Sequence, residues 1–452
     1  MKIAIAGCGK VGAALIEQLT KENHDVTIID RDESRMAYVT DSQDVMTYVG
    51  DARSVSVLKR AGVEDCDLVL AMTDDDEVNL VICLVANKIG VTRTIARVRN
   101  PVFRDTMPVI EDELGLSMVV NPDLEAAREM FNTLYFKAAG QVESFAKSRN
   151  QIFTCDIESD MPICNTKIME LYSVTKARVF ICAIKRDDEV FIPNGETKVQ
   201  AGDTLSFVAA HKEAEKFFKR IGRDTGRVRN LTIIGGGRLG FYLGRMAVEN
   251  GIPLKVIEKE VDICKSLNVS LPSADIICGD ATNMDVLEEE GVLESSAIAT
   301  LTGSDSVNVL LSMYLKRKSP EAKLITKIKS SDFEEMLYNL DVGSVYNPKY
   351  IAADHVLRYV RAMQNVLENE VQSLCHVIDN KVEVLEFLIG KDAPFIGTPI
   401  KDLKLKDNLL VTDITRGGVS FIPGGNDTIE AGDSILVVTT RTGLYRIRDI
   451  FE

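Results

Sequence analysis

The sequence predicts an α/β protein made of two Rossmann-like, doubly wound parallel sheets, each followed by a small α+β lobe. Three observations support this prediction. A glycine-rich turn of the form G-x-G-x-x-G occurs twice, at Gly7–Gly12 and at Gly235–Gly240. Strand and helix patterns alternate after each turn, as in βαβ units. Later motifs also recur at a nearly constant offset of 228 to 230 residues, which indicates a tandem duplication with small loop insertions.

The elements of the first copy follow from the spacing of apolar and β-branched residues. A strand is expected at Lys2–Ala6, a helix at Val11–Lys21 and a second strand at Val26–Asp30. Further strands are predicted at Val45–Val49, Leu68–Met72, Arg93–Val98 and Ser117–Val120. Right-handed crossovers between such strands produce a parallel sheet. The second copy repeats this order.

The duplication divides the chain into four domains. Residues 1–122 and 229–348 are predicted to form the two sheet domains, and 141–225 and 369–452 the two small lobes. Amphipathic stretches at Pro122–Ala138 and Pro348–Leu367 are expected to be helices that end the sheet domains. Beyond about Gln141 and Val371 the pattern changes to short strands separated by glycine and proline. Apolar helix faces at the ends of the sheet domains are the expected assembly surfaces.

Composition narrows the function. The 452 residues carry a formal net charge of −15, which disfavours nucleic acid or an anionic lipid surface as the main partner. No apolar run reaches the roughly 20 residues that span a bilayer, and the first residues resemble a strand and not a signal peptide, so a cytoplasmic protein is expected. The nine cysteines include no Cys-x-x-Cys pair and the four histidines have no metal spacing, so reduced thiols and no metal site are expected.

The glycine turn predicts a site for a dinucleotide. Its first glycine permits the tight turn, the second allows backbone N–H groups to approach a pyrophosphate, and the third allows close packing of helix and strand. Asp30, at the end of the second strand, is positioned to accept both ribose hydroxyls, and Glu258 is its counterpart. A carboxylate there repels a 2′-phosphate, which favours NAD(H) or an adenine nucleotide over NADP(H).

Polar residues at the ends of later strands extend the candidate site. Asp51 and its counterpart Asp280 follow the third strand, where Asp51 is either an acceptor for an adenine amino group or the N-cap of the following helix. Thr73-Asp74 and Thr302-Gly303 follow the fourth strand, near the point where strand order reverses. Arg97 and its counterpart Lys327 end the fifth strand, where each either approaches a phosphate or forms a surface ion pair.

These motifs in this order resemble the TrkA family, the regulatory subunits of bacterial Trk potassium uptake, built of two RCK N-terminal (TrkA-N) and two RCK C-terminal (TrkA-C) domains. The resemblance covers essentially the whole chain. It implies a peripheral protein on the cytoplasmic face of a potassium-translocating membrane subunit, assembled as a homo-oligomer, with a ring of four chains expected. It also implies NAD(H) as ligand, or alternatively ATP or ADP.

The resemblance further implies the residues that contact the ligand. In the first copy they are Gly7, Cys8, Gly9, Lys10, Val11, Gly12, Asp30, Asp51, Thr73, Asp74 and Arg97. In the second copy they are Gly235, Gly236, Gly237, Arg238, Leu239, Gly240, Glu258, Asp280, Thr302 and Lys327. Glu258, Lys327 and Gly303 depart from their counterparts, so the ligand and the occupancy of the second copy stay open.

An NAD-dependent oxidoreductase on a duplicated Rossmann scaffold is the alternative, because a fold does not fix a function. Tyr172 and Lys176 have the Tyr-x-x-x-Lys spacing of short-chain reductases, and Ser159 lies thirteen residues before the tyrosine. They fall in a small lobe and not in a sheet domain, and aligning the copies puts Lys404 opposite Tyr172 and Asn408 opposite Lys176. No catalytic residues are therefore predicted, and the protein is expected not to be an enzyme.

Overall fold

The protein is described by a computed structural model that divides the chain into two compact units. One unit contains Met1–Met130 and Asn230–Leu357, and the other contains Phe131–Arg229 and Arg358–Glu452. The structure describes residues 1–40, 44–135, 139, 142–144, 150–187, 189–223, 228–330, 337, 340–364, 371–378, 381–391, 393–441, 444 and 446–451.

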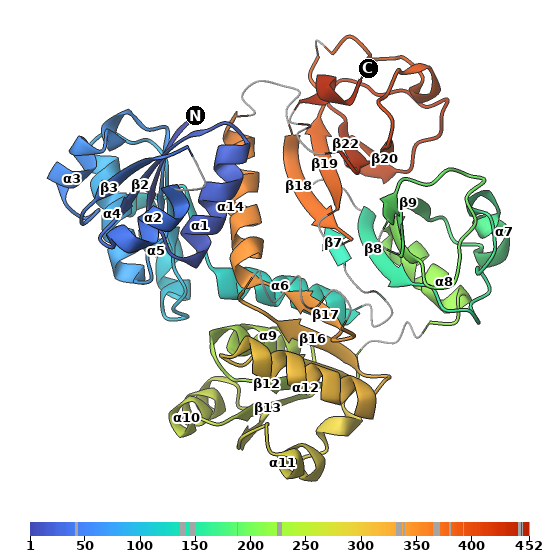
Figure 1. Ribbon diagram of the computed structural model, residues 1–452, viewed down its shortest axis with the longest axis horizontal. Coiled ribbons are helices and arrows are strands. Elements are labelled where there is room, and N and C mark those ends of the chain that lie inside the picture. Colours follow the sequence, from blue (N-terminus) through green and yellow to red (C-terminus); the bar gives the residue numbers. More distant parts are fainter. Residues whose placement is uncertain are drawn as a thin grey trace. The chain divides into compact units, whose positions relative to one another are not determined.

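The first copy contains a parallel sheet of six strands in the order β3-β2-β1-β4-β5-β6 (blue to cyan in Figure 1). Its strands are β1 (Lys2–Ala6), β2 (Asp25–Asp30), β3 (Met46–Val49), β4 (Leu68–Ala71), β5 (Thr94–Arg97) and β6 (Met118–Val120). Its helices are α1 (Lys10–Lys21), α2 (Glu33–Thr40), α3 (Val55–Arg60), η1 (Val63–Asp65), α4 (Asp76–Lys88), α5 (Phe103–Leu114) and α6 (Pro122–Tyr135). This strand order is that of a Rossmann fold, with its crossover point between β1 and β4.

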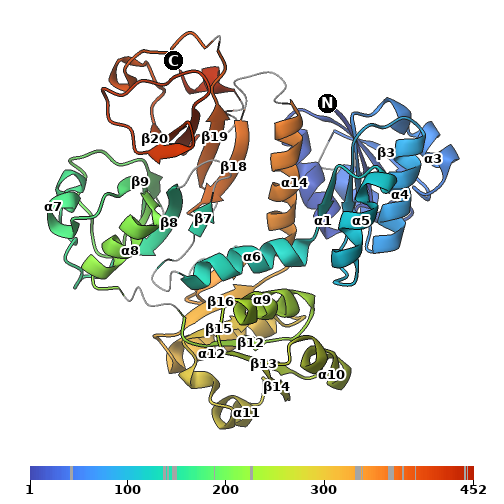
Figure 2. The same cartoon turned by 180° about the vertical axis from the view of Figure 1, so that it is seen from behind.

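The second copy repeats the sheet as β14-β13-β12-β15-β16-β17, again all parallel. Its strands are β12 (Leu231–Ile234), β13 (Leu254–Glu258), β14 (Asp275–Cys278), β15 (Ala297–Thr300), β16 (Lys323–Lys327) and β17 (Ser344–Tyr346). Its helices are α9 (Arg238–Glu249), α10 (Val261–Ser270), α11 (Met284–Glu289), η3 (Val292–Glu294), α12 (Asp305–Lys318) and α14 (Pro348–Gln364). Helix α9 packs on β12 and β13, and α12 packs on β15 and β16 (Figure 2).

Burial explains why these segments form a parallel sheet. The central strands β1 and β4 are buried on both faces, so their sequences are nearly continuous apolar runs. Helix α1 is amphipathic and buries Leu15, Ile16 and Leu19 in the core while Lys21 stays exposed at its end. The prediction of two parallel, Rossmann-like sheets is therefore confirmed.

The second unit holds the two small lobes, each with a five-stranded sheet in the described part of the chain: β10-β9-β11-β8-β7 and β18-β19-β22-β20-β21. The first lobe contains β7 (Val142–Ser144), β8 (Asn150–Asp156), η2 (Ile168–Glu170), α7 (Leu171–Thr175), β9 (Phe180–Arg186), β10 (Glu189–Phe191), β11 (Thr204–Ala210) and α8 (His211–Arg220). The second contains β18 (Val371–Val377), β19 (Val382–Leu388), η5 (Ile400–Asp402), β20 (Leu409–Arg416), β21 (Val419–Phe421), β22 (Ser434–Thr439) and η6 (Ile447–Ile450). The strand pairs are antiparallel.

The predicted element boundaries differ from the observed ones by one residue or fall outside the described residues. The third strand begins at Met46 and not at Val45, and β4 ends at Ala71 and not at Met72. The predicted helix ends at Ala138 and Leu367, and the lobe start near Gln141, lie outside the described residues.

Within the first unit, the second copy contacts the first through helix α9. The hydroxyl of Tyr242 donates to the backbone oxygen of Arg99 at 3.1 Å and accepts from the Asn121 side-chain amide at 3.0 Å. At the start of the same helix, Nε of Arg238 lies 3.2 Å from a carboxylate oxygen of Asp123. The helix that begins at the second glycine turn is thereby tied to the loops that follow β5 and β6.

Candidate nucleotide-binding sites

The two outer glycines of each turn are required by the backbone, and the central glycine is not. Gly7 has φ +102°, and a Cβ on it would lie 2.8 Å from the Thr73 nitrogen. A Cβ on Gly12 would lie 2.1 Å from the Gly7 oxygen. Gly9 has ordinary backbone angles, and a Cβ on it would meet nothing within 4 Å. The space beside Gly9 is thus open at the N-terminus of α1, where backbone N–H groups and the helix dipole favour a phosphate.

The acid at the end of β2 is held by the glycine turn. One carboxylate oxygen of Asp30 accepts from the backbone N–H of Cys8 at 2.6 Å, and the other accepts from the N–H of Asp32 at 3.0 Å. Each oxygen keeps a second acceptor position, because an ionised carboxylate has about four lone-pair sites. Asp30 can therefore accept from ribose hydroxyls while it stays in place.

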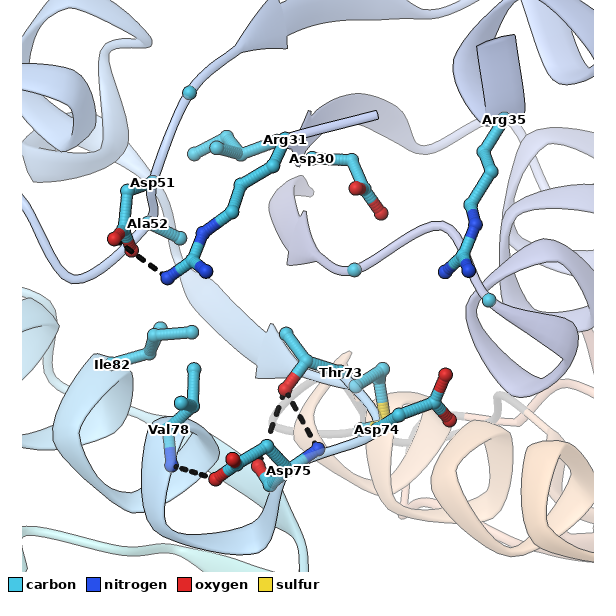
Figure 3. A pocket seen from close by; sticks show the side chains of 15 residues that line it. Asp30, Arg31, Arg35, Asp51, Ala52, Thr73, Asp74, Asp75, Val78 and Ile82 are labelled. Atoms are coloured by element: carbon cyan, nitrogen blue, oxygen red, sulfur yellow. Dashed lines mark hydrogen bonds and ion pairs between the residues drawn. The ribbon is translucent and has the colours of Figure 1, made fainter. Parts of the chain in front are cut away.

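These residues line a cleft of about 220 Å³ at the carboxyl ends of the strands. Figure 3 shows Asp30 and Arg35 on one side of the cleft and Thr73, Asp74 and Asp75 on another. The full lining is Gly7, Gly9, Ile29, Asp30, Arg31, Arg35, Gly50, Asp51, Ala52, Met72, Thr73, Asp74, Asp75, Val78 and Ile82. A cleft in this position is where open α/β sheets bind their ligands.

Asp51 forms ion pairs at the rim of the cleft. Its carboxylate accepts from the guanidinium groups of Arg31 at 2.6 Å and Arg53 at 2.7 Å (Figure 3 shows the Arg31 pair). The hydrogen bonds from Arg53, followed by those from Arg31, hold the pKa of Asp51 below its usual range. The N-cap alternative is wrong, because α3 begins at Val55 and its N-cap is Ser54. Adenine recognition by Asp51 stays a prediction.

Thr73 is fixed by a buried asparagine that was not among the predicted residues. The Asn79 side-chain oxygen accepts from both the N–H and the hydroxyl of Thr73, at 2.9 and 2.7 Å. Its amide nitrogen donates to the backbone oxygens of Thr73 and Arg97, at 3.1 and 2.9 Å. Asn308 repeats all four contacts with Thr302 and Lys327. The recurrence of asparagine at the repeat offset was the available sign of this role.

Arg97 contacts two residues of the cleft lining without lining the cleft itself. Its guanidinium donates to the backbone oxygen of Thr73 at 3.0 Å and to the carboxylate of Asp74 at 3.1 Å. The predicted ion pair is therefore formed, with Asp74 as the partner. Its arginine is only 11% exposed, so the pair does not lie fully at the surface. Arg99 adds a hydrogen bond to the backbone oxygen of Asp74.

In the second copy the acid is buried more deeply. Glu258 turns back so that one oxygen accepts from the N–H of Gly236 at 2.7 Å and the other from the N–H of Glu260 at 2.9 Å. These are the same two backbone positions that Asp30 contacts. Glu258 is 8% exposed, whereas Asp30 is partly exposed in an open cleft. The longer side chain keeps the contact with the turn but offers less of the carboxylate to a ligand.

The second copy also lacks the arginines of the first. Lys259, Ile263 and Thr282 occupy the positions of Arg31, Arg35 and Arg53. Asp280 accepts from Thr282, through the backbone N–H at 2.9 Å and the hydroxyl at 2.8 Å, where Asp51 accepts from two guanidinium groups. The rim of the second site is consequently less positive.

Lys327 is buried where its counterpart is an arginine. Its ammonium donates to the Leu301 backbone oxygen at 2.8 Å, and burial, with a smaller effect of Lys329, lowers its pKa to about 8. No described carboxylate forms a salt bridge with it. A buried lysine destabilises the folded protein when it is charged. Its ammonium is also a point charge that an anion can approach.

The residues of the alternative oxidoreductase are not arranged for proton transfer. Ser159, Tyr172 and Lys176 lie in the second unit, outside both Rossmann sheets. Helix α7 has only five residues, and Lys176 is its C-cap with φ +56°, so Tyr172 and Lys176 do not share a helix face. Asn408, aligned with Lys176, has φ +59°, which indicates a shared turn geometry.

The described part of the chain holds neither a membrane-spanning helix nor a metal cluster. None of its helices is both long enough and apolar enough to cross a bilayer. Within the same residues, no group of three or more His, Cys, Asp or Glu side chains is arranged to hold a metal ion.

We predict that Lys327→Met stabilises the ligand-free protein at pH 7, and that this gain shrinks as pH rises from about 8 to about 10.5. The folded pKa lies below the unfolded one, so the unfolded state binds more protons between these values and wild-type stability increases with pH there. The shift corresponds to roughly 3 kcal/mol at most, reduced by the lost hydrogen bond to Leu301. Urea unfolding at several pH values measures the difference. The exposed Lys265→Met is the control, and a pH-independent difference would contradict the prediction.

Family models match most of the chain in the predicted arrangement. The TrkA-N domain matches residues 3–122 and again 231–348. The TrkA-C domain matches residues 155–222 and 384–452.

Curated relatives match over all or nearly all of their length. A Trk system potassium uptake protein TrkA homolog of Archaeoglobus fulgidus is 31% identical, with all of both chains covered. The Trk system potassium uptake protein TrkA of Halomonas elongata is 27% identical and covers 100% of this chain and 98% of its own. That of Azorhizobium caulinodans is 25% identical over 100% of this chain and 99% of its own.

Solved structures share the fold. The GsuK channel superimposes with a TM-score of 0.62 at 17% identity, covering 97% of this chain and 76% of the channel chain. The GsuK channel bound to NAD gives a TM-score of 0.60 at 17% identity and the same coverage. At this identity the likeness concerns the fold alone. Together with the duplicated domains and the full-length relatives, the matches show that this chain belongs to the TrkA family of Trk potassium uptake proteins.

Proposed function

We propose that the chain is a nucleotide-sensing regulatory subunit that gates a Trk-type potassium-uptake transporter through ligand-dependent rearrangement of its Rossmann domains. The observation that carries the proposal is the cleft above the first sheet. It combines an open position at Gly9, a fixed carboxylate at Asp30 and two arginines at the rim. This set of groups suits a dinucleotide or an adenine nucleotide.

The proposed ligand is NAD(H), or alternatively ATP or ADP. Asp30 favours a ribose with a free 2′-hydroxyl, and Arg31 and Arg35 offer guanidinium groups to phosphates. Two structures of one related protein support this choice: the GsuK channel bound to NAD and GsuK bound to ADP. The latter has a TM-score of 0.50 at 14% identity and covers 80% of this chain and 69% of its own. The protein is proposed not to be an enzyme, because the Tyr172 and Lys176 geometry does not support hydride chemistry.

The proposed location is the cytoplasmic face of the membrane, in contact with the potassium-translocating subunit, with four chains in a ring. Matching apolar positions on α4 and α12 support association between chains. Val81 is 41% exposed, and its counterpart Leu310 is 66% exposed, with Met313 at 41% beside it. Exposed apolar side chains at the same position of both copies are suited to repeated contacts in a closed oligomer.

We predict that Asp30→Ala weakens nucleotide binding more than Glu258→Ala. Asp30 lies in an open cleft with arginines at the rim, whereas Glu258 is buried and its site has fewer cations. Loss of hydrogen bonds to a charged group corresponds to roughly a tenfold or greater loss of affinity. Calorimetric titration with NADH, NAD, ATP and ADP, with sites counted per chain, measures both variants. Equal losses would refute the asymmetry, and no loss in either would refute the ribose assignment.

The contact through Tyr242 provides a route by which the two sites affect one another. Arg99 binds the Asp74 backbone in the first site, and its own backbone oxygen accepts from Tyr242. Tyr242 lies on α9, which begins at the second glycine turn. A ligand that moves Asp74 in the first site, or the glycine turn in the second, therefore acts on the same hydroxyl. Sites joined in this way are typically coupled by about 1 to 3 kcal/mol.

We predict that Tyr242→Phe leaves both sites able to bind but reduces the coupling between them. In protein that keeps Tyr242, we expect nucleotide to bind the second site with one affinity when the first site is filled and with another when Gly9→Val blocks the first site. In Tyr242→Phe protein we expect these two affinities to become nearly equal. Calorimetry on the four proteins measures it. Tyr172→Phe, an exposed tyrosine of the other unit, is the matched control. Undiminished coupling in Tyr242→Phe would exclude this route.

We predict that nucleotide changes potassium flux only when this protein is present and its glycine turns are intact. Gly9→Val and Gly237→Val put side chains into open space, so they should block the ligand and keep the core. Rubidium flux into proteoliposomes that contain the Trk membrane subunit, with and without the protein and each nucleotide, measures the effect. Flux that ignores both additions, or a double variant that still responds, would refute the proposed role.

A further inference from the structure

The second copy contains a pair of neighbouring thiols beside its ribose acid. The sulfur of Cys264, on α10, lies 3.3 Å from the backbone oxygen of Glu258. Cys278 ends β14 and is the register partner of Glu258 on the adjacent parallel strand. The Cys278 thiol is near enough to Cys264 to raise the pKa of the Cys264 thiol. Cys264, Cys278 and the acid of the second site thus form one cluster.

The two thiols differ in accessibility. Cys264 is 5% exposed, and burial together with the neighbouring Cys278 raises its pKa to about 11. Cys278 is exposed at the end of its edge strand. An exposed thiol that reacts first, next to a buried thiol that resolves the product, is the arrangement of a redox-sensitive pair.

The pair is specific to the second copy. Met36 and Val49 occupy the positions of Cys264 and Cys278 in the first copy, so no disulfide can form there. Cys83, Cys155 and Cys182 are buried, and burial raises the pKa of each thiol to about 12. Such thiols are protected from oxidants.

We propose that a peroxide converts Cys264 and Cys278 into a reversible disulfide that regulates nucleotide binding at the second site. The Cys278 thiolate attacks one peroxide oxygen, the O–O bond breaks, and Cys278 becomes a sulfenic acid as the other oxygen leaves as water or alcohol. The Cys264 sulfur then attacks the Cys278 sulfur, the S–O bond breaks and water leaves. Two thiols are oxidised and one peroxide is reduced.

The disulfide would change the site through Glu258. An S–S bond of about 2.05 Å is shorter than a thiol–thiol contact, so it would draw α10 toward β14. Oxidation also removes the S–H donor from the Glu258 backbone oxygen. The carboxylate of the same residue accepts from the N–H of Gly236 in the glycine turn. A shift of the Glu258 backbone would therefore also reach the glycine turn.

Two measurements on the full-length protein test this inference. Formation of the disulfide is tested first, and only the second measurement, on nucleotide binding, rests on the proposed function. The protein is treated with hydrogen peroxide, free thiols are alkylated, and disulfides are mapped by mass spectrometry. We expect a Cys264–Cys278 cross-link that dithiothreitol removes. Its absence would overturn the inference. The exposed Cys278→Ser is the main variant, because a substitution at buried Cys264 risks a folding defect.

NADH titration of reduced and oxidised Gly9→Val protein then isolates the second site. We expect the dissociation constant to change about fivefold or more on oxidation, and not in the Gly9→Val, Cys278→Ser double variant. A cross-link with an unchanged constant would overturn the regulatory role of the disulfide. A reduced Gly9→Val protein that binds no nucleotide would instead refute the proposed function of the second copy, while the cross-link result stands on its own.

Discussion

One buried asparagine in each copy holds together the strand ends on which the site depends. Asn79 uses both acceptor positions and both donor protons of its amide to join Thr73 at the end of β4 to the backbone of Arg97 at the end of β5. It is fully buried, so removing its amide would leave the polar groups that it contacts without these partners, at a cost of about 1 to 3 kcal/mol for each group left unpaired away from water. The crossover edge of the sheet is therefore rigid, and the glycine turn packs against a fixed Thr73.

The parts of the site that follow from local backbone rules could be predicted from the sequence. A glycine turn between strand and helix requires glycine at Gly7 and Gly12 for steric reasons, and the acid at Asp30 follows at the spacing that the fold sets. Duplication supplied a second test of each motif. These features depend on residues close in sequence, which is why pattern alone identifies them.

The remaining parts depend on side-chain directions that a sequence does not contain. Asn79 is polar and lies on a helix, so nothing in its type distinguishes it from an exposed residue. Asp51 had two open interpretations, and the structure removes the N-cap because the helix begins after Ser54. Lys327 occupies the position of Arg97, where a surface ion pair was one alternative. In the structure its buried ammonium donates to a backbone oxygen and not to a carboxylate. Arg31 and Arg35 were missed because their charges turn toward the cleft only in the folded chain.

Among the residues that the structure describes, the contact between Tyr242 and Asn121 is formed once and has no counterpart between the equivalent positions. In the first copy Ala14 occupies the position of Tyr242, and Asn347 occupies that of Asn121 with no partner for its buried amide among the described residues. Two identical half-length chains paired about a two-fold axis would form such a contact twice or not at all. In a single chain that carries both copies this restriction does not apply, so the two positions can hold different residues. The two halves are therefore not interchangeable. A protein built from either half alone would contain only one of the two residues that form this hydrogen bond.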